Sequence, residues 1–120
     1  MKKQILFVVA MMLMGLGLTA QAQTPELDKW IDGRVKYYTE HLDLTSEQIE
    51  QVRGFFVESG KRGAEIKETL KGEEATKASW QNQNERKRKM RSILTNEQKQ
   101  KFKELEQREK EEYRKKKTNN

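Results

Sequence analysis

The sequence of 120 residues contains no cysteine, one proline and one histidine. Without cysteine there are no disulfides and no lipid-modified cysteine, so packing alone must stabilise the fold. One histidine, His41, also leaves too few ligands for a dedicated zinc or copper site. We therefore expect no metal and no other cofactor. We interpret His41 as a capping group near the end of a first helix.

Long apolar runs are missing too, except at the N-terminus. There Ile5 to Leu18 is almost entirely apolar, follows Lys2 and Lys3, and precedes Ala20-Gln21-Ala22. This order is typical of a cleavable signal peptide, and the run is shorter than the roughly 20 apolar residues that cross a bilayer. We predict that residues 1–22 are a signal peptide and that the mature chain is exported. A retained membrane anchor is the alternative.

Apolar side chains are scarce in the remaining 98 residues, where Leu, Ile, Val and Phe together number sixteen. This share is below the roughly 20% that accompanies disorder. A core this small favours burial against a second copy of the chain, so we expect a homodimer. We predict one helical domain over 23–114 and a basic, disordered tail over 115–120.

The composition favours helices throughout. The charged stretches are rich in Glu, Lys, Gln and Arg, which form helices readily, and no strand-like alternation is present. We therefore predict an all-α fold of about four helices. The first is expected from Pro25 to 41–43, the second from Thr45 to a break at Lys71-Gly72, the third over 73–92 and the fourth from Thr95. On the fourth, several Glu residues precede Lys or Arg by four positions, as in Glu106 and Lys110, which favours ion pairs.

Three glycines interrupt the predicted second helix, namely Gly54, Gly60 and Gly63. Each costs roughly 1 kcal/mol relative to alanine. Either another backbone comes close at these positions, or the helix bends, or the glycines are tolerated weak spots.

An internal repeat is the strongest signal. Leu44-Thr45-Ser46-Glu47-Gln48 recurs as Leu94-Thr95-Asn96-Glu97-Gln98, 50 residues later. In each copy the threonine hydroxyl can accept from the glutamine N–H, while the glutamine side chain reaches back to the threonine N–H, a capping box. Leu44 can also pack on Ile49 as a hydrophobic staple. The repeat therefore predicts two helix starts and no catalysis.

Two copies of L-T-x-x-Q behind a signal peptide resemble the LTxxQ-motif family of small periplasmic proteins, the Spy/CpxP-like group. The resemblance is carried by six residues: Leu44, Thr45, Gln48, Leu94, Thr95 and Gln98. It implies an extended, kinked helical hairpin that forms a cradle-shaped antiparallel homodimer in the periplasm. It further implies an ATP-independent chaperone, or holdase, whose basic face with apolar patches binds unfolded or partly folded proteins.

A surface of that kind needs cations for long-range attraction and exposed apolar side chains for adaptable contact. The cations that we consider are Lys61, Arg62, Lys67, Arg86, Lys87, Arg88, Lys89 and Arg91. The apolar residues are Phe55, Val57, Trp80 and Met90. The alternatives are a solvated helix face for the charges, and a core or dimer interface for Phe55 and Trp80.

Other functions are less consistent with the sequence. No catalytic triad, glycine-rich phosphate loop or metal cage is present, so we do not expect an enzyme. Export argues against a nucleic-acid partner, and a basic helix this poor in apolar residues allows at most peripheral membrane contact. The alternative function is an envelope-stress regulator that docks on the periplasmic domain of a sensor kinase through the cations from Arg86 to Arg91.

Overall fold

The computed structural model describes residues 24–119, so the predicted signal peptide lies outside the described residues. Four helices and no strand occupy the described range, which confirms the all-α class and the number of helices. They are α2 (Pro25–Leu42), α3 (Ser46–Thr69), α4 (Gly72–Ile93) and α5 (Asn96–Asn119). None of these four combines the length and the apolar composition that crossing a bilayer would require.

Several helix boundaries lie at capping or turn residues that the sequence indicates. Thr24 precedes α2, and its side chain accepts a hydrogen bond of 3.1 Å from the N–H of Leu27. The α3–α4 break contains Gly72, whose φ of 63° lies in the left-handed region that glycine adopts without a steric penalty. At the end of α2, His41 Nδ1 lies 2.8 Å from the carbonyl oxygen of Tyr37, so His41 interacts with the last turn as expected.

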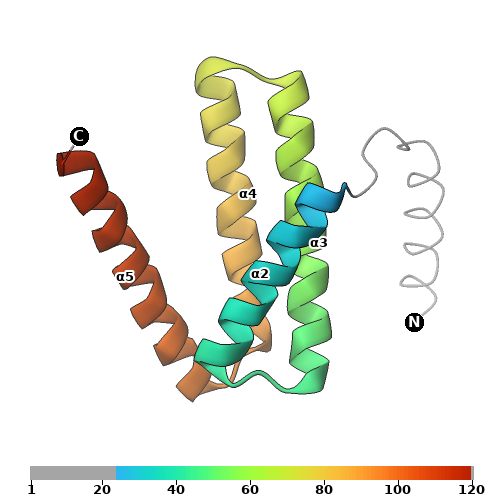
Figure 1. Ribbon diagram of the computed structural model, residues 1–120, viewed down its shortest axis with the longest axis vertical. Coiled ribbons are helices and arrows are strands. Elements are labelled where there is room, and N and C mark those ends of the chain that lie inside the picture. Colours follow the sequence, from blue (N-terminus) through green and yellow to red (C-terminus); the bar gives the residue numbers. More distant parts are fainter. Residues whose placement is uncertain (1–23, 120) are drawn as a thin grey trace.

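Helices α3 and α4 form an antiparallel hairpin that α2 crosses on one face, while α5 diverges from the other three helices (Figure 1). The core lies where α2 covers the hairpin and the start of α5. Tyr38 of α2 is at its centre, with its ring 5.7 Å from that of Phe56 and 5.8 Å from that of Phe102. The other buried apolar residues are Ile31, Val35, Leu42, Leu44, Val52, Ile66, Met90, Leu94 and Leu105.

The glycines of α3 are in different surroundings. A Cβ atom added to Gly60 would lie 2.6 Å from Cδ1 of Leu27 and 3.3 Å from the ring of Trp30, so side chains of α2 pack close to this glycine. A Cβ atom at Gly54 would meet nothing within 4 Å. Gly60 therefore serves packing, whereas Gly54 is a tolerated weak spot.

The C-terminal segment differs from the predicted disordered tail, because α5 continues through it to Asn119. Two physical reasons favour the helix. Lysine is a good helix former, and Lys116 and Lys117 lie in the last turn, where positive charge interacts favourably with the helix dipole.

Candidate functional site

Both copies of the repeat form capping boxes, as predicted. Thr45 Oγ1 accepts from the N–H of Gln48 at 3.1 Å, and Gln48 Oε1 accepts from the N–H of Thr45 at 3.0 Å. In the second copy, the corresponding distances between Thr95 and Gln98 are 3.2 Å and 3.0 Å. The two motifs therefore start α3 and α5 in the same way.

The two glutamines also bind each other, which the sequence analysis did not predict. Gln48 Nε2 donates to Gln98 Oε1 at 2.8 Å, and Gln98 Nε2 donates to Gln48 Oε1 at 3.0 Å. Each amide makes a further bond across the junction, from Gln48 to the carbonyl of Ile93 and from Gln98 to the carbonyl of Leu42, both at 3.1 Å. Both side chains are buried, and we call them the glutamine pair.

The glutamine pair joins segments that are 50 residues apart in the sequence. Each Nε2 has two protons to donate and each Oε1 has two lone pairs. All of these find partners in the other amide, the two capping boxes and the two main-chain carbonyls. Leu44 and Leu94, the first residues of the two motifs, are buried in the same core cluster, and Ile49 packs against it. The repeat is therefore structural, and it holds the start of α5 against the start of α3.

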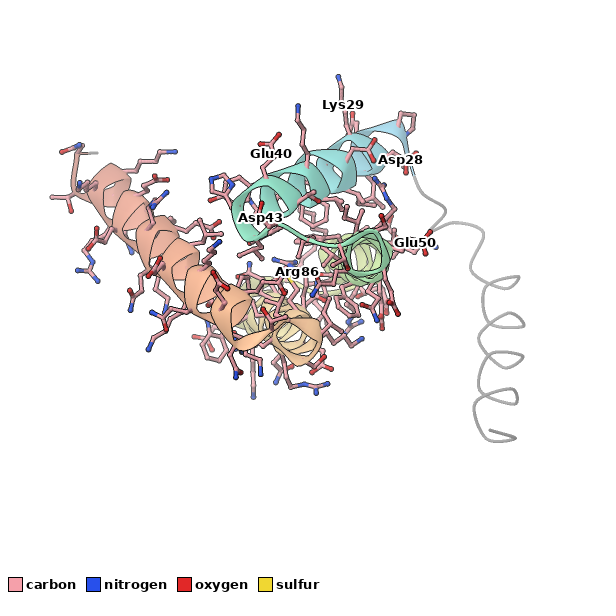
Figure 2. All side chains as sticks on the ribbon, turned by 90° about the horizontal axis from the view of Figure 1, so that it is seen from below. Asp28, Lys29, Glu40, Asp43, Glu50 and Arg86 are labelled. Carbon is pink, nitrogen blue, oxygen red and sulfur yellow. The ribbon has the colours of Figure 1, made fainter. Side chains whose placement is uncertain are left out.

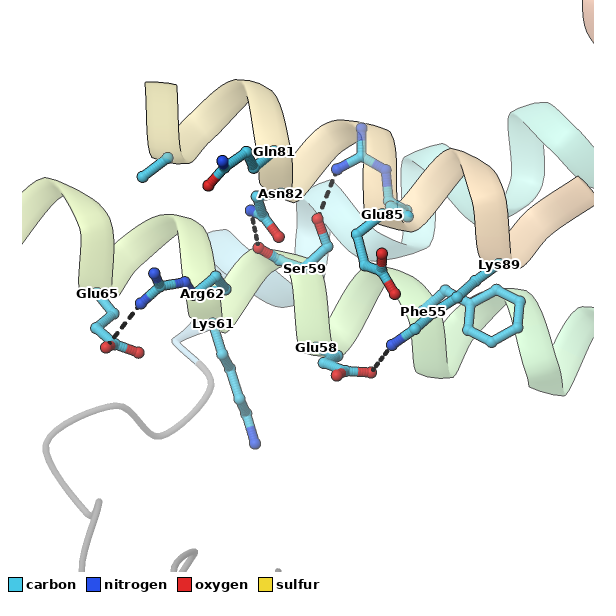
Figure 3. Close-up of a pocket in the computed structure, with 12 residues that line it drawn as sticks. Phe55, Glu58, Ser59, Lys61, Arg62, Glu65, Gln81, Asn82, Glu85 and Lys89 are labelled. Carbon is cyan, nitrogen blue, oxygen red and sulfur yellow. Dashed lines mark hydrogen bonds and ion pairs between the residues drawn. The ribbon is translucent and has the colours of Figure 1, made fainter. Parts of the chain in front are cut away.

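A groove of about 520 Å³ runs between α3 and α4. Five of the residues predicted to bind clients line it: Phe55, Lys61, Arg62, Arg86 and Lys89. Three carboxylates that the sequence analysis did not include line it as well: Glu58, Glu65 and Glu85 (Figure 3).

The groove carries both signs of charge, and two of its cations, Arg62 and Lys89, pair with carboxylates. Lys89 pairs with Glu58 across the two helices at 2.9 Å, and Arg62 pairs with Glu65 within α3 at 2.9 Å. A hydrogen bond from Arg88 holds the pKa of Glu85 below its usual value. The three-residue spacings within α3 and α4 were visible in the sequence, whereas the pairing of Lys89 depends on how the helices pack.

Arg86 belongs more to the core than to the surface. Its guanidinium carbon lies 4.8 Å from the ring centre of Phe56 and 5.8 Å from that of Trp30, and Nη1 donates to Ser59 Oγ at 2.7 Å. Burial lowers the pKa of Arg86. Figure 2 shows Arg86 between α2 and the hairpin, so its charge supports the packing of three helices.

The prediction that Met90 is an exposed contact residue is wrong. Its side chain is 1% exposed, because it lies on the face of α4 that packs into the core cluster. Val57 is half-buried and also packs against the core. Trp80 is 68% exposed, so within one copy of the chain it is not a core residue.

The remaining predicted cations do not converge on the groove. Lys87 and Arg91 pair with Glu106 of α5 at 3.6 and 3.2 Å, whereas Lys67 and Arg88 are exposed to solvent. In the described part of the chain, no cluster of three or more histidine, cysteine or acidic residues is arranged to hold a metal ion. The arrangement is suited to reversible contacts through charges, amides and a few apolar side chains.

No family model matches the chain, and no curated protein or solved structure matches it either.

Proposed function

We propose that this protein is an ATP-independent periplasmic chaperone of the LTxxQ-motif, Spy/CpxP-like kind. The observation that carries the proposal is the paired motif. Two L-T-x-x-Q sequences start two helices with the same capping boxes, and the glutamine pair joins them. The segment 1–22, with the pattern of a signal peptide, supports export.

The groove between α3 and α4 is the proposed client-binding surface. Phe55 gives it a half-buried apolar side chain, and its surface ion pairs can exchange partners with charges of either sign on an extended client. Trp80, on the same hairpin, is exposed and gives a second apolar contact. Such contacts are weak one by one and adaptable together, which suits binding to many different unfolded chains.

We also propose that the protein is a homodimer. The described core is small, and Trp30, Trp80 and Tyr113 remain 40%, 68% and 68% exposed. A second copy that covers part of this surface would bury more apolar area than one chain can. Sedimentation equilibrium tests this directly, and a monomer at all concentrations would contradict it.

The chaperone proposal is tested by light scattering from an aggregating, chemically unfolded client. We expect the mature protein to suppress aggregation at stoichiometric amounts without ATP. The variant Phe55→Ala/Trp80→Ala should suppress it less, whereas Tyr113→Ala, which removes an equally exposed aromatic from α5, should act like the unmodified protein. Unchanged aggregation at several-fold excess of the protein would refute the proposal.

The alternative, a regulator that docks through the cations from Arg86 to Arg91, has less support. Lys87 and Arg91 pair with Glu106 of α5, whereas Lys89 pairs with Glu58 of α3. Arg86 packs on aromatic rings, so these cations do not form one basic surface for a partner.

A further inference from the structure

One face of α5 carries a row of cations. Lys99, Lys103, Lys110, Arg114 and Lys117 follow one another at steps of four, seven, four and three residues, which keeps them on one side of a helix. All five side chains are exposed. At a rise of 1.5 Å per residue, the row is about 27 Å long. We call these five residues the basic row.

The basic row has no internal counter-charge. None of its five residues forms an ion pair within the part of the chain that the structure describes. The spacing of Glu106 and Lys110 favoured a pair on α5, but Glu106 lies 3.2 Å from Arg91 and 3.6 Å from Lys87 of α4 instead. The one carboxylate within the row is therefore already neutralised by two further cations.

The opposite side of α5 is balanced. Glu97, Glu104 and Glu111 are spaced by seven residues, and Lys101, Arg108 and Lys115 each follow one of them by four positions. The helix thus separates a side with balanced charges from a side whose unpaired charges are all positive. Because α5 leads away from the other helices, the basic row stays accessible along its length (Figure 1).

We propose that the basic row docks the protein on an anionic membrane surface, where it binds the phosphate groups of lipid headgroups. A straight row of cations along a helix can contact the phosphate groups of a flat membrane surface over its whole length. Each Lys or Arg near an anionic membrane contributes to binding. Tyr113, beside the row, is 68% exposed and of the residue type that favours the headgroup region. Few other apolar side chains are available on α5, so the protein would lie on the membrane and not insert into it.

A hollow at the base of the row supports this ligand. It lies between the end of α4 and α5 and has a volume of about 520 Å³. It is lined by Lys99, Lys103 and Lys110 of the row and by the ion pair of Arg91 with Glu106. Lys99 and Lys103 are one helical turn apart and form no ion pair among the described residues, so both can contact one phosphate group there. A nucleic acid is less well matched, because aromatic side chains do not alternate with the cations as they do in stacking platforms.

The test measures whether the protein co-sediments with vesicles of equal parts phosphatidylglycerol and phosphatidylcholine. Residues 1–22 are removed, because their apolar run would itself bind lipid. The four helices and the core all lie within 24–119, so this chain retains the fold. The test variant is Lys103→Gln/Lys110→Gln/Lys117→Gln. The matched control is Lys101→Gln/Arg108→Gln/Lys115→Gln, which removes the same charge at the same seven-residue spacing from the balanced side.

We expect binding to the anionic vesicles, at least tenfold weaker binding to phosphatidylcholine alone, and a loss of about fivefold per residue removed from the row. The test variant should therefore bind about 100-fold more weakly, while the control, about one helix diameter away and beyond a Debye length, should change little. Equal losses in both variants would show that net charge alone matters, and would overturn the proposal. So would no vesicle binding, or binding through the row to an oligonucleotide or an acidic unfolded protein but not to vesicles.

Membrane docking and chaperone activity can fail separately. The aggregation assay uses soluble clients and contains no lipid, and the substitutions in the basic row leave Phe55 and Trp80 intact. We expect the test variant to retain full suppression of aggregation. Loss of suppression in this variant, with unchanged vesicle binding, would contradict the assignment of the row to the membrane.

Discussion

Replacing the buried glutamines tests whether the junction between the two repeats depends on their mutual hydrogen bonds. We consider Gln48→Met, Gln98→Met and the double variant, because methionine keeps the length of the side chain and removes its amide. In Gln98→Met, Gln48 loses one acceptor and one donor in a buried site, and the carbonyl of Leu42 loses its donor. A buried group left without a partner costs about 1–3 kcal/mol, so each single variant should lose about 3 kcal/mol of stability.

The double variant should lose less than the sum of the two. Both side-chain amides are absent in the double variant, so no buried amide is left without a partner. Only the main-chain groups that the two glutamines had bound lose their partners. We expect a loss of about 4 kcal/mol, which gives a coupling energy of about 2 kcal/mol between the two positions.

Urea denaturation followed by far-UV circular dichroism measures these differences. Gln51→Met and Gln100→Met, exposed positions on the same two helices, are the controls and should stay within about 0.5 kcal/mol of the unmodified protein. If the loss in the double variant equals the sum of the two single losses to within about 0.5 kcal/mol, the two side chains act independently, which would contradict the predicted coupling.

Three further predictions concern the core and α3. Gly54→Ala should stabilise the protein by about 1 kcal/mol, because the new methyl group meets open space in a helix interior, and a thermal melt with an unchanged or lower midpoint would contradict this. Met90→Ala should cost about 2–4 kcal/mol because Met90 is buried, whereas Trp80→Ala should change stability by less than about 0.5 kcal/mol in a monomeric sample; urea midpoints distinguish the two. Burial raises the pKa of Tyr38 above its ordinary value of 10.0, so the unfolded chain loses this proton first and stability should fall as the pH rises above that value. In Tyr38→Phe, urea titrations at alkaline pH should show a smaller fall, and an identical pH dependence would mean that Tyr38 is not its source.

The local features of the fold could be predicted from the sequence. A capping box needs only residues three apart, so the spacing of Thr45 and Gln48 was sufficient to predict the start of α3. Along α2, apolar residues recur at steps of three and four positions, a spacing that is visible in the sequence, and Ile31, Val35 and Tyr38 form its inner face.

The long-range features could not be predicted in the same way. That Gln48 meets Gln98 depends on how α5 returns to the start of α3, and no local spacing encodes this. Glu106 had a suitable partner at Lys110, four residues away, yet it pairs with Arg91 and Lys87 of another helix. The sequence therefore indicated which charged residues belong to the candidate site. It did not indicate which of them form ion pairs, because ion pairs between helices depend on how the helices pack.

The hydrogen bonds between Gln48 and Gln98 give the α3–α4 hairpin a property of its own. The glutamine pair holds the start of α3 close to the residues that follow α4, and the turn at Leu70 to Gly72 lies at the opposite end of the hairpin. Whole helical turns could be added to or removed from α3 and α4 at that end, while the glutamine pair and the packing of α2 and α5 keep their geometry. The length of the hairpin can thus be changed, by evolution or by design, without changing the rest of the protein.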